Sequence, residues 1–348
     1  MKIKIDRTIE HPAFAVALST DFRKIAISGC TNIAVYSLAD YSLVMKIPAK
    51  NVSSMVYLSD DCSMLIQNTT GSLFLWDGTR LKRAGKLPEP EWTGEPLHYG
   101  DDAHIFWNGS SGIWCYDATT CNMKQIFVTE GRTIICGCSQ GIIRFLTRAG
   151  YDNPPVDEQN IQITEMLFDG TILRTHTTSQ QLKTRSVNRP AWSEDGIIAV
   201  STVAAPTGFV SDLTEVILYE FTPQGRARIK EVAGGANPWS PPHAVMYLMD
   251  DEGQILLEKH YDDHRDSGNL YCGHGLLAKS CFSAGSVSFM TIRDLEIVGI
   301  IDKNDLAHGS RVNPPTFVLF LPDKRILVGS WNKLLVCQFE PSQANATN

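Results

Sequence analysis

The sequence predicts an all-β protein with the architecture of a seven-bladed β-propeller, and three observations lead to this prediction. Short apolar strands recur along nearly the whole chain, with almost no helical periodicity. The strands fall into units of ~40–50 residues with four strands each, which is the repeat of a propeller blade. A spare strand at the N-terminus, MKIKIDR, can supply a strand that the last unit lacks.

One series of turns joins the first two strands of the units. Each segment reads as an apolar strand, a tight turn with an aspartate and a second apolar strand, as in VALSTDFRKIAISG and VLFLPDKRILVGS. Aspartate suits such turns because its side chain accepts hydrogen bonds from nearby backbone N–H groups. The turn acids are Asp21, Asp61, Asp102, Asp195, Asp251 and Asp323.

A second series of turns, rich in small residues, leads to a third strand, as in ISGCTNIAVYSL, and a fourth strand closes most units. The predicted units are 14–48, 52–88, 95–128, 132–177, 188–232, 243–301 and 316–339. The last unit has only three strands, so pairing with the N-terminal strand would close the ring without exposed edges. The sixth unit carries one strand too many, and the strand register of the fourth and sixth units stays open.

Across nearly its whole length the chain resembles the WD40-like β-propellers. One unit has the Trp-Asp dipeptide of that family, Trp76–Asp77 in LFLWDG, and Asn32 stands closest to the Asp of its third-strand turns. The Gly-His dipeptide of the family is absent from most units, so the repeats are degenerate, and lactonase-like and quinoprotein-like propellers stay open. The resemblance implies one propeller over residues 1–340, followed by a polar tail at 341–348.

Composition and charge narrow the class of protein. The net charge is -7 and no Lys/Arg-rich run occurs, which argues against nucleic acid as a partner. No apolar window approaches the ~18 residues of a membrane span, and the N-terminus lacks the apolar core of a signal peptide. The nine cysteines are irregularly spaced, as expected of reduced thiols. We therefore expect a cytoplasmic protein that binds no membrane and carries no cofactor.

Two motifs resemble catalytic sites, and neither is convincing. GCSQG at residues 137–141 matches G-x-S-x-G, but a nucleophile elbow needs a helix after the serine, and the strand-like IIRFL follows Ser139. SEDGIIAV at Ser193 is the nearest match to the Asp-turn of sialidases, and it lacks the Thr-Trp that ends that motif. Both segments are better explained as turns between strands, so the sequence favours a protein that is not an enzyme.

The segment EKHYDDHRDSGNLYCGH at 258–274 gathers the residue types that bind metals. Its first candidates as ligands are His260, Asp263, His264 and His274. Residues four apart in an extended segment lie ~13 Å from each other, which is too far for one ion unless the chain bends. A solvated loop is therefore the favoured interpretation, and a composite metal or ligand site at the central channel stays open.

The long connections are expected on one face of the ring. In propellers the connections from the fourth strand to the next blade share a face with the turns between the second and third strands. The long connections of this kind are 88–96, 150–160, 203–212, 233–243, 258–274 and 303–315. The acids in or beside them are Glu89, Glu91, Glu95, Asp152, Asp157, Glu158, Asp212, Asp262, Asp263 and Asp266.

Three tryptophans, Trp92, Trp239 and Trp331, fall on the same face, and tryptophan is a favoured anchor of protein interfaces. The leading hypothesis is therefore a non-enzymatic scaffold that binds a protein partner through an acidic face carrying these tryptophans. The alternative is a propeller enzyme, lactonase-like or another hydrolase, or a small-molecule or metal binder that uses the central channel. The fold alone does not choose between them.

Overall fold

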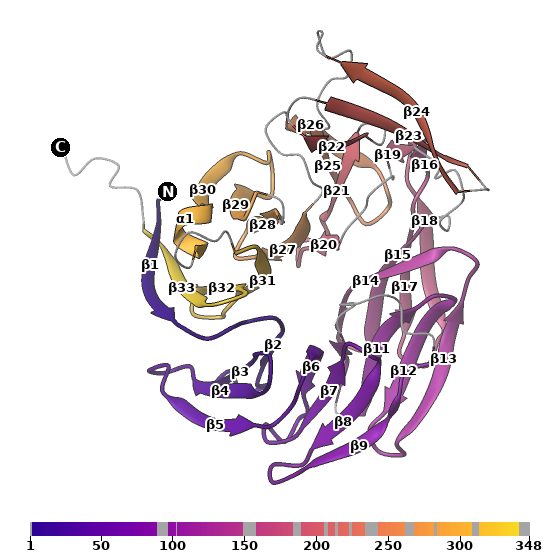
Figure 1. Ribbon diagram of the computed structural model, residues 1–348. Helices are drawn as coiled ribbons and strands as arrows, with labels where there is room; N and C mark the ends of the chain where they lie inside the picture. The colour runs from indigo at the N-terminus through magenta and orange to yellow at the C-terminus, as the bar shows by residue number, and fades with distance from the viewer. Residues whose placement is uncertain are drawn as a thin grey trace, which may run out of the picture.

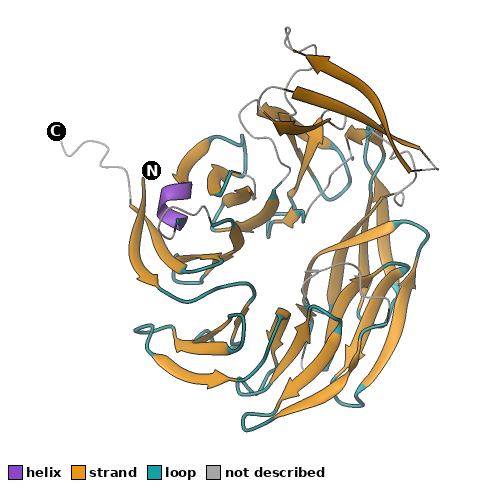
Figure 2. Ribbon diagram, in the orientation of Figure 1, coloured by secondary structure: helices purple, strands orange, loops and turns teal. Residues whose placement is uncertain are grey.

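The computed structural model shows seven four-stranded antiparallel sheets arranged as blades around a central axis (Figure 1). The prediction of an all-β, seven-bladed propeller is therefore confirmed. Strands and short connections make up almost all of the described chain, and its one helix is short (Figure 2). The structure describes residues 2–88, 97–101, 103–148, 158–183, 189–204, 208–212, 215–222, 225–233, 243–261, 268–281, 284–307 and 313–340.

The first four blades follow one another directly in the sequence, and each keeps the chain order from its inner to its outer strand. The first blade contains β2 (Val16–Leu18), β3 (Lys24–Ser28), β4 (Ile33–Ser37) and β5 (Leu43–Ile47). The second contains β6 (Val52–Tyr57), β7 (Met64–Asn68), β8 (Ser72–Trp76) and β9 (Leu81–Lys86). The third contains β10 (His98–Tyr99), β11 (His104–Gly109), β12 (Gly112–Asp117) and β13 (Asn122–Val128). The fourth contains β14 (Arg132–Ser139), β15 (Ile142–Arg148), β17 (Gln162–Leu167) and β18 (Ile172–Thr177).

The last three blades complete the ring. The fifth contains β20 (Ala191–Trp192), β21 (Ile198–Ala204), β25 (His243–Met249) and β26 (Ile255–Tyr261). The sixth contains β27 (Asn269–Gly273), β28 (Leu276–Cys281), β29 (Ser286–Thr291) and β30 (Ile297–Ile301). The seventh contains β31 (Pro315–Phe320), β32 (Ile326–Ser330), β33 (Leu334–Glu340) and the N-terminal β1 (Lys2–Ile9), and helix α1 (Lys303–Leu306) precedes it.

Two small sheets lie outside the blade pattern. One is a ladder between β16 (Glu158–Gln159) and β19 (Leu182–Lys183) beside the fourth blade, whose four blade strands are the four that the sequence predicts. The other is a three-stranded sheet of β22 (Gly208–Asp212), β23 (Glu215–Thr222) and β24 (Gly225–Ala233). This sheet is inserted between the second and third strands of the fifth blade, and Figure 1 shows it outside the ring.

The predicted boundaries of the fifth and sixth units are wrong. The fifth blade takes only its first two strands from the unit predicted at 188–232. Its second strand, β21, pairs with β25, which follows the inserted sheet in the sequence. The two strands at 243–261, predicted to begin the sixth unit, therefore belong to the fifth blade, and their removal leaves the sixth blade with four. Alternating apolar residues predict strands in either case, but they do not say which strands pair.

The N-terminal strand closes the ring as predicted. β1 pairs antiparallel with β33, from Lys2 opposite Glu340 to Ile9 opposite Leu334. The N-terminal strand thus supplies the fourth strand of a blade whose other three come from the end of the chain. This pairing covers the free edge of β33, which would otherwise expose unpaired backbone groups.

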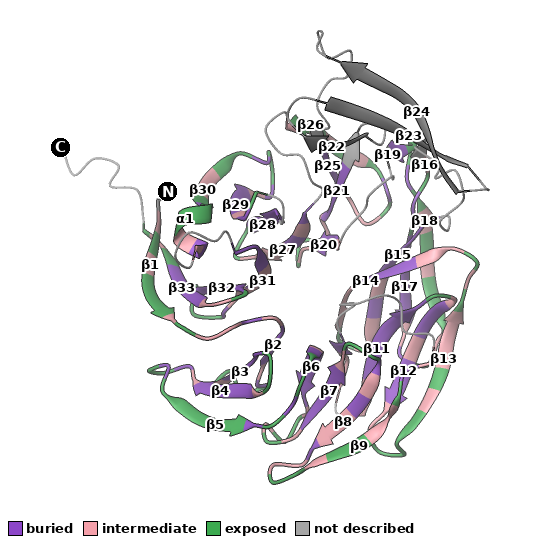
Figure 3. Ribbon diagram, in the orientation of Figure 1, coloured by how far each residue is buried: buried purple, intermediate pink, exposed green. Residues whose placement is uncertain are grey.

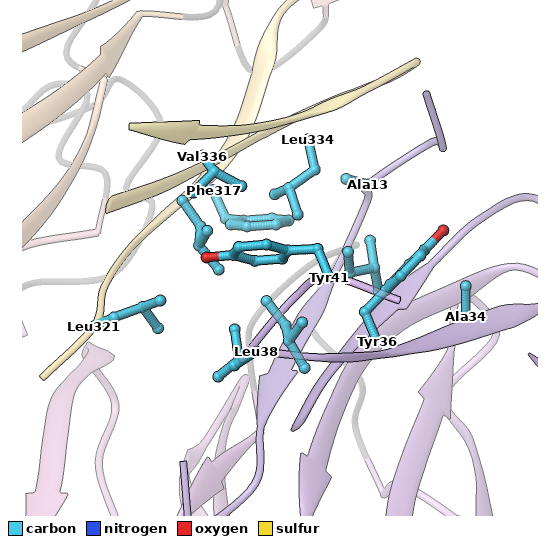
Figure 4. Close-up of a cluster of buried hydrophobic side chains, with 12 residues drawn as sticks. Ala13, Ala34, Tyr36, Leu38, Tyr41, Phe317, Leu321, Leu334 and Val336 are labelled. Atoms are coloured by element: carbon cyan, nitrogen blue, oxygen red, sulfur yellow. The ribbon is translucent and has the colours of Figure 1, made fainter. Parts of the chain in front are cut away.

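The core is divided into seven apolar clusters, and each lies between two consecutive blades. Inner and middle strands are mostly buried, whereas outer strands such as β5 are mostly exposed (Figure 3). We use the name closing seam for the ladder between β1 and β33 together with Arg325 and the cluster between the seventh and first blades. Figure 4 shows its side chains Tyr41, Phe317 and Leu334 gathered between the two blades.

The acidic turns form as predicted in several blades. Asp21 Oδ1 accepts a hydrogen bond from the Arg23 N–H at 3.0 Å. Asp323 Oδ1 accepts one from the Arg325 N–H at 3.1 Å. In the fifth blade this role belongs to Ser193 rather than Asp195, because the Ser193 hydroxyl accepts the Ile197 N–H at 3.0 Å. Asp102 lies outside the described residues.

Two other turns contain a pair of acids, and the predicted acid is not the one that binds its own turn. The first of each pair, Asp60 or Asp250, accepts from the backbone of its own turn. The second reaches the preceding blade: Asp61 Oδ1 accepts from the Thr20 N–H at 2.6 Å, and Asp251 forms an ion pair with an arginine of the fourth blade. Doubled acids therefore fasten neighbouring blades to each other.

Candidate functional site

The strand order places two kinds of connection on one face of the ring. Successive strands of each blade run antiparallel, so each second strand ends, and each first strand begins, on the same side. We call this side the loop face; it carries the connections between second and third strands and those between blades. The long connections predicted from the sequence are all of these two kinds. The strands on either side of these connections therefore end and begin on the face that the sequence predicts.

Of the three predicted tryptophan anchors, the structure describes Trp331. It lies in the turn between β32 and β33, on the loop face, and 46% of it is exposed. The turn is braced, because Lys333 Nζ donates to the Asp305 carbonyl at 3.1 Å and Asn332 Nδ2 donates to Asn313 Oδ1 at 2.8 Å. A large indole is thus presented on a support that includes helix α1.

The remaining predicted features of this face are only partly described. Trp92 and Trp239 lie outside the described residues, as do most of the acids in the long connections. The described loop face carries polar turns at Thr70 and Ser111, and α1, whose first residue is the exposed Lys303. The role of Trp92, Trp239 and Trp331 as partner anchors stays a prediction.

The candidate metal ligands that the structure describes do not meet. His260 lies on the outer strand β26, where its Nε2 is 2.9 Å from Glu258 Oε1. His274 lies in the turn between the first and second strands of the sixth blade, on the opposite face, and its Nε2 is 2.6 Å from the Leu321 carbonyl. Asp263 and His264 lie outside the described residues. Among the residues that are described, no three His, Cys, Asp or Glu side chains form a metal-binding group.

The two motifs that resemble catalytic sites are turns between strands. Ser139 ends β14, and β15 begins at Ile142, so a strand follows where a nucleophile elbow requires a helix. The Ser139 hydroxyl accepts from Arg144 Nη1 at 2.9 Å. Ser193 lies in the turn between β20 and β21, where it binds the backbone of its own turn.

A cavity of about 270 Å³ lies on the axis of the ring. Its walls come from the inner strands β2, β6, β10, β27 and β31, together with Arg189, two residues before β20. Most of the lining is apolar, and the polar members are Thr20, Ser54, Tyr57, Tyr99, Arg189 and Tyr271. Among the described lining residues, none is an aspartate or a glutamate. Arg189 is therefore the only formal charge that lines the described cavity.

Backbone contacts with the sixth blade hold Arg189 in place. Its N–H donates to Asn269 Oδ1 at 3.3 Å, and its carbonyl accepts the Leu270 N–H at 2.9 Å. Its guanidinium carbon lies 5.2 Å from the centroid of the Tyr271 ring, within range of a cation–π interaction. In the described part of the chain, no carboxylate forms a salt bridge with Arg189.

The charge of Arg189 acts on groups from several blades. Burial, with a smaller contribution from Arg189, lowers the pKa of His98 on β10 to about 3. Burial raises the pKa of the Cys136 thiol on β14 well above its usual range. Burial also raises the pKa of Cys272 on β27, to about 11, and in both cases Arg189 opposes the rise. The position of Arg189 in the lining of the axial cavity explains why its charge acts on three blades. His98 is 8% exposed, and its Nε2 has no hydrogen-bond partner among the described residues.

Sequence reasoning missed the channel residues, although a signal existed. Arg189 stands in NRPAWS, just before the first strand of the fifth unit, and first strands are the ones that surround the axis. Asking which polar residues occur in or next to first strands would have found Arg189, Tyr99 and Tyr271. The alternative of a channel site, which the sequence left open, instead rested on histidines and acids that cluster in one loop.

The classification of this chain rests on its fold, because no model of a protein family matches the sequence and no curated protein matches it significantly. No helix of the described residues is long and apolar enough to cross a membrane. The seven blades closed by β1 are the architecture of WD40-like propellers, in agreement with the resemblance found in the sequence.

Proposed function

We propose that this protein is an interaction scaffold that binds a protein partner through the loop face. The observation that carries the proposal is the half-exposed Trp331 on its braced turn. Tryptophan at the centre of an interface contributes a large apolar area at low entropic cost, and a rigid support lowers that cost further. Trp92 and Trp239, in two other connections of the same face, complete the proposed set of anchors.

The partner that suits this face is basic or of mixed polar and apolar character. The connections assigned to the loop face contain many acids, and the whole chain has a net charge of -7. Opposite charges on two surfaces speed their association and select among partners. All nine cysteines are free thiols, which supports a reducing location such as the cytoplasm.

The alternative of a hydrolytic channel receives less support. A general acid or base for hydrolysis is usually a carboxylate or a histidine within reach of the substrate. The polar groups of the described lining are hydroxyls, phenols and one guanidinium. Such a lining suits the binding of a ligand better than its cleavage, and we do not propose a catalytic reaction.

A variant pair tests which face binds the partner. The native chain, Trp331→Ala and Phe22→Ala are each immobilised, and bound proteins from the source cell are quantified. Phe22 is the matched control because it is 53% exposed in the turn between β2 and β3, on the opposite face. We expect a partner that the native chain and Phe22→Ala retain and that Trp331→Ala loses by about tenfold or more, as for an interface anchor.

The identified partner is then purified and titrated against each variant, so that direct binding is measured. Equal affinities for the native chain and Trp331→Ala would contradict the role of Trp331. A loss with Phe22→Ala alone would place the partner on the opposite face. The melting temperatures of both variants must match that of the native chain before either result is read.

A further inference from the structure

A positively charged side chain in unusual surroundings lines the axial cavity. Arg189 lines the cavity, and the described residues offer its guanidinium an aromatic ring but no carboxylate. A guanidinium on the wall of an apolar cavity has lost part of its hydration, and an anion can restore the lost interactions through two parallel N–H···O bonds. The contact with the Tyr271 ring is a cation–π interaction and supplies no negative charge, so the described residues leave the guanidinium without a counter-ion.

We propose that the central channel binds a small organic monocarboxylate with an apolar body, whose carboxylate contacts the Arg189 guanidinium. One cation and no acid line the described cavity, which matches a single negative charge better than a doubly charged phosphate. This site is separate from Trp331 and does not depend on a protein partner.

The remaining walls select the body of the ligand. Leu18, Met55, Leu97, Phe317 and Leu319 line the cavity together with the rings of Tyr99 and Tyr271. Binding sites for small molecules typically combine such apolar walls with a few polar groups that fix orientation. The volume of about 270 Å³ lies at the small end of ligand cavities and suits one ring or a short alkyl chain.

The position of Arg189 defines the route of entry. The residue precedes a first strand, and first strands begin on the loop face, so the backbone of Arg189 lies toward that end of the channel. A ligand that enters from the loop face meets the guanidinium first. Its apolar body then extends toward Leu18 and Tyr99, which lie near the other ends of their strands.

Calorimetric titration with matched acids and amides tests the proposal. The probes are benzoate and hexanoate, their neutral counterparts benzamide and hexanamide, and inorganic phosphate. We expect the native chain to bind at least one of the two carboxylates with a Kd below about 1 mM and its amide about tenfold more weakly or worse. Phosphate, which lacks an apolar body, should bind no better than the amides.

Three variants assign the binding to one side chain. Arg189→Met removes the charge at similar length and should weaken binding of the carboxylate by about tenfold or more, to the level of the amide. Arg189→Lys keeps the charge but not the paired donors, and should fall between the two. Arg23→Met is the control, because Arg23 lies in an exposed turn between β2 and β3 on the opposite face and should leave binding unchanged.

Several outcomes would overturn the proposal. These are no saturable binding of either carboxylate up to about 10 mM, equal binding of acid and amide, or undiminished binding by Arg189→Met. If phosphate binds as tightly as benzoate, the site recognises charge alone, and the proposed contribution of the ligand's apolar body is wrong. If Arg189→Met does not fold, Arg189→Lys decides, because unchanged carboxylate affinity in that variant would exclude paired recognition by the guanidinium.

Discussion

The closing seam and the fifth blade complete the same kind of four-stranded sheet from distant segments in two different ways. At the seam, the two ends of the chain meet, and β1 pairs with β33 over nearly its full length. In the fifth blade, β21 pairs with β25 although the inserted sheet of β22, β23 and β24 separates them in sequence. The seventh and fifth blades thus depend on pairing between strands that are not neighbours in sequence.

Side chains at the closing seam add contacts beyond the backbone ladder. Arg325 of the seam donates to the Leu38 carbonyl at 2.9 Å and to the Tyr41 hydroxyl at 2.6 Å, and its guanidinium carbon lies 5.2 Å from the Tyr41 ring. Arg7 of β1 contacts the same ring from 5.7 Å. The seam therefore joins the last blade to the first through the ladder, the apolar cluster and a shared tyrosine. We therefore expect the seam to govern global stability, and we expect the inserted sheet, which Figure 1 shows outside the ring, to contribute less.

Removal of residues 1–8 should have the largest effect. The deletion takes away almost all of β1, exposes the edge of β33 and removes Ile3 and Ile5 from the cluster between the sixth and seventh blades. We expect the melting temperature to fall by about 10 °C or more, because several kcal/mol of packing are lost in a chain of this size. Differential scanning calorimetry of the native and shortened chains measures the effect.

A chain that ends at residue 340 is the control for this deletion, because it keeps every described strand. Its melting temperature should match that of the native chain. An equal melting temperature for the chain without residues 1–8 would show that closure by β1 contributes little to stability.

Acidification should destabilise the protein through His98 of the third blade, whereas the groups at the seam should not respond. The pKa of this buried side chain is about 3 in the folded protein, against 6.5 in the unfolded chain. Between these values the unfolded chain binds a proton that the folded chain does not, so stability falls as the pH falls. From pH 7 to pH 5 this one group should cost about 2 kcal/mol, and His98→Phe should abolish that part of the loss. Urea unfolding of both chains at the two pH values measures the difference.

At the seam, hydrogen bonds from Arg325 lower the pKa of Asp323, and burial raises the pKa of Tyr41, so neither group titrates between pH 5 and pH 7. Tyr41→Phe should therefore show the same pH-dependent loss as the native chain. Equal losses of stability in the native chain and His98→Phe would contradict a depressed pKa at His98. They would show that other groups cause the acid sensitivity.

Local sequence patterns were sufficient to predict most of the blades. Apolar alternation and the turn acids depend on residues close in sequence, which is why the fourth blade and the turns at Asp21 and Asp323 were found correctly. The closure by β1 was predictable because one unit lacked a strand and one strand had no unit. The partition of the fifth and sixth blades was not, because the strands at 208–233 have the same pattern as blade strands.

The candidate sites were less predictable because they depend on which faces and blades meet. His260 and His274 are close in sequence, yet they lie on different blades and opposite faces of the ring. Arg189 and Tyr271 are distant in sequence and contact each other at the axis. Trp331 was found because a turn between second and third strands has a fixed side in any propeller, so its placement followed from the repeat alone.

Excision of the inserted segment should have the smallest effect on stability and provides the sharpest contrast with the seam. Ala204 and His243 are the last paired residues of β21 and β25, so an Asn-Gly turn in place of residues 205–242 would join the two strands as a hairpin. We expect the melting temperature to change by less than about 3 °C, because the excision leaves every strand of the seven blades and shortens the loop that must close. The excised chain also lacks Trp239, so its partner affinity should fall while its stability is retained. A drop in melting temperature as large as that caused by deleting β1 would show instead that the inserted sheet supports the fifth blade, and the contrast between the two regions would then be wrong.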